Sequence, residues 1–146
     1  MRDVSFTIIR DTREQKPYEF KDYPVSIRDQ ALPTGDYSVE GYETEFAIER
    51  KTKSDFLRSI TFERDRFQRE VGRATGFINP MVIVVEAPYI DFKTGRYFND
   101  IPVKSITNTV ASWQSRYNVD FIFEDDRSRG ERRTYLQLTE WLLESS

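Results

Sequence analysis

The feature that most constrains the fold is an uninterrupted apolar run at 81–85, Met-Val-Ile-Val-Val. Asn79-Pro80 precedes the run and Glu86 ends it. Successive side chains of a strand point to opposite faces of a sheet, so a run without a polar position is buried on both faces. The sequence therefore predicts a central strand here, in a sheet that is covered on both sides.

The segments around this run supply the remaining layers. Alternating apolar residues predict strands at 4–11, within 23–31 and at 118–123, whereas helical spacing predicts helices at 53–61, 61–77, 103–117 and 129–143. Trp113 is expected in the core rather than on a surface that stacks bases. This mixture of strands and helices predicts an α/β three-layer sandwich, with helices flanking one mixed sheet.

Composition limits the chemistry that the chain can perform. Its 146 residues make one domain of ordinary size, and they include neither cysteine nor histidine. This excludes disulfides, thiol nucleophiles, structural zinc and imidazole catalysis. A metal would be held through oxygen, which favours Mg²⁺ or Mn²⁺. A general base would be a carboxylate, a lysine or a metal-bound hydroxide.

Charge and hydropathy limit the possible partners of the chain less strictly than composition limits its chemistry. The net charge of −3 and the pI near 5.2 argue mildly against a general nucleic-acid coat, but DNA binding follows local patches of charge. No apolar run approaches the roughly 18 residues of a membrane helix, and the N-terminus lacks the apolar stretch of a signal peptide. We expect an intracellular protein without a membrane partner, in the cytoplasm of a prokaryote or virus-infected cell, or in a nucleus.

A predicted hairpin organises the candidate site. The segments 37–39 and 45–48 are extended runs around a turn at 40–42, where glycine supplies the backbone angles of a tight turn. Asp36 starts the first strand of this hairpin and Glu49 ends the second. Antiparallel pairing would bring the two carboxylates together at one end of the sheet.

The next residues add a cation. Strand alternation places Glu49 and Lys51 on one face and Arg50 on the other. Two acids and an ammonium group suit a hard divalent cation and a phosphodiester. Gly35, beside Asp36, is expected to let the backbone approach a phosphate or a metal closely.

These residues resemble a known pattern. Gly35-Asp36, a spacer, Glu49-Arg50-Lys51, three residues and then Asp55 are similar to the signature of XPF-type structure-specific nuclease domains, a group that includes archaeal Hef. Further similarity lies in 9–14, with the family's Asp-x-Arg-Glu, in 55–60 and in Arg66-Phe67, so that it spans about residues 5–140. The larger restriction-endonuclease-like PD-(D/E)XK group shares a pattern of one Asp, followed at a distance by Asp or Glu, any residue and Lys. Asp36, Glu49 and Lys51 fill these positions.

The resemblance implies a metal-dependent DNA endonuclease with a three-layer α/β/α restriction-endonuclease-like fold, acting at branched or flap-like DNA. Asp36 and Glu49 would ligate Mg²⁺ or Mn²⁺, with Asp11 as a further or water-mediated ligand. Lys51 would orient or deprotonate the attacking water, or stabilise the charge of the phosphorane. Arg50 would brace the site through a carboxylate such as Glu14 or Asp55. Arg13 would contact the scissile or an adjacent phosphate.

Several of these residues have a second interpretation. Asp11 and Glu14 could belong to a solvated turn instead of the mouth of the site. Asp55 could complement the dipole of the helix that follows the signature. The arginines Arg66, Arg69 and Arg73 share a helical face, which is either solvated or in contact with DNA phosphates.

Family members work as dimers, homodimers or heterodimers, in which nuclease domains contribute to the interface. The apolar stripe Tyr135, Leu138, Trp141 and Leu142 lies on the last predicted helix, where nothing later in the chain could cover it. It predicts either an interface or packing on the domain's own sheet.

The resemblance also leads to expectations about the number of domains in the chain and about its activity. The helix-hairpin-helix module and the helicase domain of many relatives are absent from this sequence, so we expect a single nuclease domain over 1–146. The family includes inert scaffolds with decayed signatures, and such a scaffold, binding DNA or a nuclease partner, is the alternative function. The filled signature favours an active enzyme. A free-standing nuclease of a virus or mobile element, and an ordinary α/β domain with a chance motif, are further alternatives.

Overall fold

The structure, a computed structural model, describes residues 5–97 and 100–145. Within them, six strands form one sheet in the order β2-β1-β3-β4-β5-β6. The strands are β1 (Phe6–Arg10), β2 (Val25–Asp29), β3 (Tyr37–Val39), β4 (Ile48–Thr52), β5 (Met81–Glu86) and β6 (Val119–Phe123). The helices are α1 (Lys53–Ser59), α2 (Arg64–Gly72), α3 (Tyr89–Lys93), α4 (Val103–Arg116) and α5 (Arg127–Glu144).

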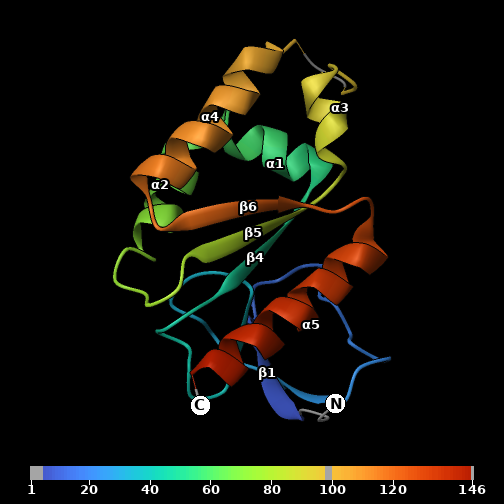
Figure 1. The fold of residues 1–146 in the computed structure, drawn as a ribbon, viewed down its shortest axis with the longest axis vertical. Coiled ribbons are helices and arrows are strands. Elements are labelled where there is room, and N and C mark those ends of the chain that lie inside the picture. Colours follow the sequence, from blue (N-terminus) through green and yellow to red (C-terminus); the bar gives the residue numbers. More distant parts are fainter. Residues whose placement is uncertain (1–4, 98–99, 146) are drawn as a thin grey trace.

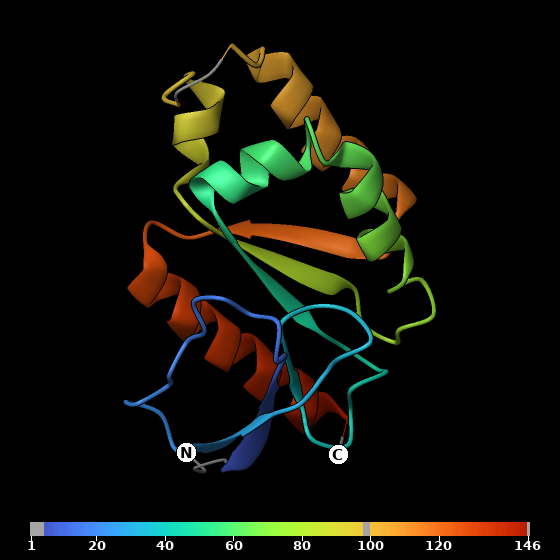
Figure 2. The same ribbon diagram turned by 180° about the vertical axis from the view of Figure 1, so that it is seen from behind.

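The sheet is mixed and has helices on both faces. β4, β5 and β6 are parallel, β3 is antiparallel to both β1 and β4, and β2 is parallel to β1. Helices α1 to α4 gather over the half of the sheet that contains β5 and β6, and α5 crosses the opposite face (Figures 1 and 2). This arrangement confirms the predicted three-layer α/β fold.

β5 is the central strand that its apolar run predicts. It pairs with β4 on one side and β6 on the other, and all of 81–85 is buried. Met81, Ile83 and Val85 enter the core under α1 to α4, whereas Val82 and Val84 enter the core under α5. The strand therefore joins the two cores of the domain, and each of its buried aliphatic side chains contributes about 1.5–3 kcal/mol.

Helix α5 packs its apolar stripe on its own sheet. Leu138 and Trp141 are buried, and Tyr135 stacks on Tyr23 with ring centroids 4.6 Å apart. Leu142 packs against the same core. Of the two interpretations of this stripe, packing on the domain's own sheet is confirmed, and the stripe is not left uncovered for a partner.

Three further expectations are corrected. The second hairpin strand begins at Ile48 rather than Glu45 and continues to Thr52, since every residue of β4 pairs in register with β5. Glu49 is therefore near the start of that strand and not at its end. The helix predicted at 61–77 is the shorter α2.

The predicted loop at 88–102 contains helix α3, which buries Phe92 against Phe56 and Phe123, with ring centroids 5.1 and 5.5 Å away. Within the described residues, the remaining strands and helices lie where they were predicted, and Trp113 is in the core. Val4 of the first predicted strand and residues 98–99 of the predicted loop lie outside the described residues. Among the described helices, none combines the length and apolar character that a bilayer crossing requires.

Candidate active site

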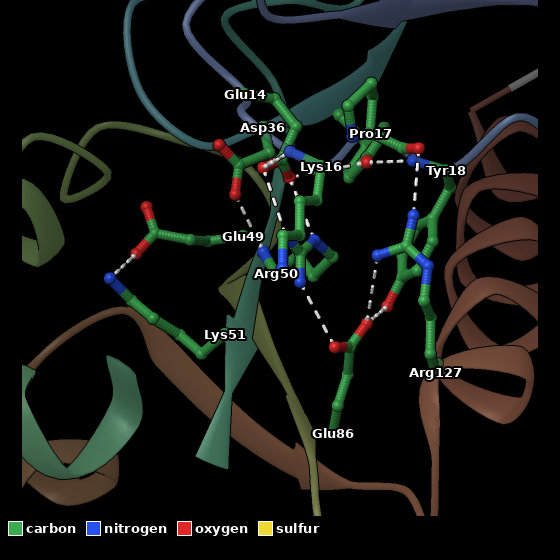
Figure 3. Close-up of polar contacts among 12 residues, drawn as sticks. Glu14, Lys16, Pro17, Tyr18, Asp36, Glu49, Arg50, Lys51, Glu86 and Arg127 are labelled. Atoms are coloured by element: carbon green, nitrogen blue, oxygen red, sulfur yellow. Dashed lines mark hydrogen bonds and ion pairs between the residues drawn. The ribbon is translucent and has the colours of Figure 1, made fainter. Parts of the chain in front are cut away.

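The ends of three strands bring Asp36 and Glu49 together. Tyr37 of β3 lies opposite Ile48 of β4, and the two strands are antiparallel. Asp36, one residue before Tyr37, therefore lies near Glu49, one residue after Ile48. The Asp36 N–H donates to the carbonyl of Ile48 at 2.8 Å, and the Asp11 N–H donates to the carbonyl of Asp36 at 2.8 Å. The carboxylate of Asp36 in turn accepts from the backbone N–H of Arg50 at 2.8 Å (Figure 3). This geometry agrees with the antiparallel pairing expected from the sequence.

Gly35 allows this close approach of the backbone segments. Its φ is +80°, in the left-handed region that favours glycine, and an added Cβ would lie 2.9 Å from Cβ of Ala47. The same Cβ would lie 3.2 Å from the carbonyl oxygen of Ile48. The glycine thus serves contact with β4, a reason that differs from the expected approach to a phosphate or metal.

Glu49 and Lys51 form a pair on one face of β4. The Lys51 Nζ lies 2.9 Å from Oε2 of Glu49, and Figure 3 shows both side chains on the side away from Arg50. Burial lowers the pKa of Lys51, but the attraction of Glu49 outweighs it and leaves this pKa above its usual value. Lys51 therefore carries its positive charge at neutral pH.

The charge of the two acids is only partly compensated. Burial raises the pKa of Glu49 despite the attraction of Lys51. Burial, followed by repulsion from Glu49 and Glu14, raises the pKa of Asp36 well above its usual value. Within the described residues, the buried Oε2 of Glu49 has the Lys51 ammonium 2.9 Å away and no further polar partner. The buried carboxylate of Glu49 and the half-buried carboxylate of Asp36, with one lysine beside them, fit a divalent cation.

Their number also matters for the choice of cation. No group of three or more acidic side chains in the described part of the chain is arranged as a ready metal cage. Mg²⁺ in proteins is commonly held by one or two carboxylates together with water and substrate phosphates. Asp36 and Glu49 supply that number of carboxylates.

Arg50 lies on the opposite side of β4, between two buried carboxylates. Its Nε lies 3.2 Å from Oε2 of Glu14, and its Nη1 lies 3.1 Å from Oε1 of Glu86 (Figure 3). The expected pairing with Glu14 is confirmed. The alternative pairing with Asp55 is wrong, because Asp55 lies at the first turn of α1 and pairs with Arg58 at 3.4 Å.

Sequence reasoning missed the other half of this network. The hydroxyl of Tyr18 donates to Oε2 of Glu86 at 2.5 Å, and the guanidinium of Arg127 lies 4.9 Å from the centroid of the Tyr18 ring. Glu86 ends the central strand. The change from a buried apolar run to an acidic residue could have identified Glu86 from the sequence. The link from Tyr18 to Glu86 joins residues 68 positions apart and has no local pattern.

Asp11 has its carboxylate engaged by the protein. Arg13 donates from Nε and Nη2 to its two oxygens, both at 2.9 Å, and the Leu32 N–H donates at 2.8 Å. Burial raises the pKa of Asp11, but these hydrogen bonds outweigh it and leave the pKa below its usual value. Direct metal ligation by Asp11 would require Arg13 to turn away, and the guanidinium side chain of Arg13 is 69% exposed.

A cleft of about 640 Å³ collects these groups. It is lined by almost all of the predicted site residues, namely Asp11, Arg13, Glu14, Asp36, Glu49, Arg50, Lys51, Asp55, Arg66 and Arg73. Arg69, the third arginine of the predicted face, is not part of the lining. Lys16, Arg58 and Glu70 also line the cleft and were not predicted. Glu70 follows Arg66 by one helical turn and lies 3.6 Å from it, a spacing that the sequence does show.

Comparison with known families decides the identity of the domain. The family model described as the ERCC4 domain matches residues 10–130. The chain belongs to the ERCC4 domain family. The matched range contains every residue that lines the cleft. The match confirms the resemblance to XPF-type nuclease domains.

Solved structures show the same fold for this ERCC4 domain. XPF from Aeropyrum pernix is 24% identical, with a TM-score of 0.68 over 90% of this chain and 61% of that one. XPF from Aeropyrum pernix in complex with DNA is 22% identical, with a TM-score of 0.64 over 92% of this chain and 66% of that one. The ERCC4 domain thus spans somewhat less than two thirds of each of these chains. No protein of curated function matches it.

Proposed function

We propose that this ERCC4 domain is a metal-dependent endonuclease that hydrolyses phosphodiester bonds in DNA, at branched or flap-like structures. The observation that carries the proposal is the meeting of Asp36, Glu49 and Lys51 in the cleft, where a buried carboxylate oxygen of Glu49 has only Lys51 as a polar partner among the described residues. The XPF structure in complex with DNA supports DNA as the partner.

In this proposal Asp36 and Glu49 hold Mg²⁺ or Mn²⁺, and Asp11 contributes through water. The bound cation supplies Lewis-acid polarisation of the phosphate. The burial of Glu49 and the partial burial of Asp36 strengthen their attraction for a cation. Arg50, held between Glu14 and Glu86, keeps β4 in place and thereby positions the backbone N–H that binds Asp36.

The charge of Lys51 bears on its three expected roles, which are to orient the attacking water, to deprotonate it or to stabilise the charge of the phosphorane. Its raised pKa keeps it protonated, which favours stabilisation of the developing negative charge, or orientation of the attacking water, over proton abstraction. Arg13 has an exposed side chain at the rim and is proposed to contact a phosphate. Arg66, Arg69 and Arg73 are proposed to contact the DNA backbone, with Arg66 and Arg73 directly at the cleft.

Cleavage assays test the proposal. Labelled duplex, flap, fork and single-stranded DNAs are incubated with the protein and Mg²⁺ or Mn²⁺, and the flap and fork substrates should be cut fastest. Ca²⁺ should support binding without turnover, because its looser coordination positions the attacking water poorly. Absence of cleavage on every substrate with either metal would refute the proposal.

Two substitutions separate the metal from the lysine. Asp36→Asn should abolish cleavage and weaken the binding of Mn²⁺ in calorimetry, because an anionic oxygen is lost. Lys51→Ala should abolish cleavage with unchanged or tighter binding of Mn²⁺, because a nearby positive charge is removed. If Asp36→Asn binds Mn²⁺ as tightly as the parent, or if either variant cuts at the parental rate, the assignment of the site is wrong.

The alternative function is an inert scaffold that binds DNA or a nuclease partner. It is favoured by the engagement of both Asp11 oxygens by Arg13 and Leu32, which leaves two acids for the metal. Calorimetry distinguishes the alternatives, since a scaffold would bind DNA but not Mn²⁺. Dimerisation through the nuclease domain is likewise proposed from the family resemblance alone, because the stripe on α5 no longer supports it.

A further inference from the structure

A second hollow lies beside the catalytic cleft. Its volume is about 450 Å³, within the range of about 300–1,000 Å³ typical of small-ligand pockets. Its apolar lining includes Leu57, Phe62 and Tyr97. Thr52, Ser54 and Arg58 line both this pocket and the cleft, so the two are adjacent.

Phe62 is the exceptional residue of this pocket. It lies in the turn between α1 and α2 and is 92% exposed, although nearly all other aromatic side chains of the domain are packed in the two cores. Neither core uses it, and a fully exposed phenylalanine at the edge of a pocket has no packing role in the domain. Its ring is therefore available to a ligand.

The walls of the pocket are held in place. Lys53, at the start of α1, donates from Nζ to Asp91 at 2.9 Å and to the carbonyl of Arg96 at 2.5 Å. The hydroxyl of Tyr97 donates to the carbonyl of Ile101 at 2.5 Å. These contacts tie the segment after α3 to α1. The part of the pocket lined by Lys53 and Tyr97 is thus fixed before any ligand arrives.

We propose that this pocket receives an unpaired nucleobase of the DNA strand that passes through the cleft, with the base stacking on Phe62. The inference rests on the proposed nuclease function. A strand whose phosphate lies at Arg58, on the boundary of the two hollows, presents its neighbouring base to the apolar side. A base within a duplex is already stacked and paired, so only an unpaired one enters. The pocket would therefore select DNA with unpaired nucleotides near the scissile phosphate.

Substitutions of Phe62 test this without the need for cleavage. Binding of a single-stranded oligonucleotide and of a blunt duplex is measured in Ca²⁺. Phe62→Ala should weaken single-strand binding by about 5- to 140-fold, the equivalent of one lost stacked base, and leave duplex binding unchanged. Because Phe62 is exposed, the variant should fold as the parent does. Ile78→Ala, at a 74% exposed position outside both hollows, is the matched control and should change neither affinity.

Phe62→Trp supplies a direct report of stacking. It should retain single-strand binding, and its emission should be quenched by the oligonucleotide, as Trp113 and Trp141 are buried and add a constant background. Ile78→Trp should not be quenched. Unchanged single-strand affinity of Phe62→Ala, an equal loss on duplex, or absence of quenching in Phe62→Trp would overturn the proposal.

The same experiment separates this proposal from the nuclease proposal. Stacking on Phe62 in a protein that cuts no DNA with Mg²⁺ supports the pocket and refutes the nuclease. Cleavage that proceeds with the same substrate preference in Phe62→Ala overturns the pocket and leaves the nuclease intact.

Discussion

Gly130, in the first turns of α5, is predicted to be indispensable although it lies outside the cleft. It is buried against the loop that carries Tyr18. A Cβ added at this glycine would lie 2.5 Å from the hydroxyl oxygen of Tyr18 and 3.4 Å from Cγ of Glu86. Gly130→Ala therefore forces a displacement of the network that braces Arg50.

Tyr18 has little room to yield. Its ring stacks on Tyr37 with centroids 5.3 Å apart and meets Phe20 edge-on at 5.9 Å, and its hydroxyl donates to Glu86. Overpacking of a core costs about 1–3 kcal/mol, and a lost hydrogen bond to a charged group costs about 1.5–3 kcal/mol. Alanine recovers up to about 1 kcal/mol of helix propensity. We expect the free energy of unfolding to fall by about 1.5–5 kcal/mol.

Urea unfolding measures this change, with Gly72→Ala as the matched control. Gly72 is also a helical glycine, at the end of α2, but a Cβ there meets nothing within 4 Å. Gly72→Ala should leave stability unchanged or raise it by up to about 1 kcal/mol. Equal midpoints for the two variants would refute the reasoning.

A double mutant locates the cause of the loss. Tyr18→Phe removes the hydroxyl oxygen that the new methyl group meets, so Gly130→Ala should cost less in that background than in the parent. Additive losses would show that the clash lies elsewhere. Under the proposed function, Gly130→Ala should also slow cleavage, because Glu86 is bonded to Arg50 at 3.1 Å.

The remaining predictions concern charge and assembly. The pKa of Asp36 is raised, chiefly by burial, so the folded state binds more protons than the unfolded state and stability falls as pH rises above the ordinary carboxyl range. Asp36→Asn should therefore raise Tm at neutral pH without metal, by about 2–4 °C per kcal/mol gained. The lowered pKa of Asp11 has the opposite sign, so Asp11→Asn should lower Tm at neutral pH, and the loss should disappear as pH falls through the acid range. A rise in Tm for Asp11→Asn, or a fall for Asp36→Asn, would contradict these signs. Neutralising Arg66 and Arg73 should flatten the salt dependence of DNA binding by about two units, and neutralising Arg69 by less, because only the first two line the cleft. An equal salt slope in all variants would exclude these contacts. Light scattering should show a dimer if the family resemblance extends to assembly, and a monomer at micromolar concentration would exclude it.

Much of the site follows from local pattern. Strand alternation alone places Glu49 and Lys51 on one face and Arg50 on the other, and this holds whatever the strand pairs with. The run at 81–85 likewise requires cover on both faces wherever it is placed in the sheet. Periodicity of this kind is a property of neighbouring residues, so the sequence determined it by itself.

Only the tertiary structure decided which faces and partners are used. The stripe on α5 is the same whether a partner or the domain's own sheet covers it, and the contact of Tyr135 with Tyr23 shows that the sheet does. The sequence pattern assigns Arg69 to the same helical face as Arg66 and Arg73, but in the folded domain it does not line the cleft. The bond from Tyr18 to Glu86 depends on chain segments that meet after folding. Such contacts are selected by the burial of whole surfaces, which no local pattern of residues encodes.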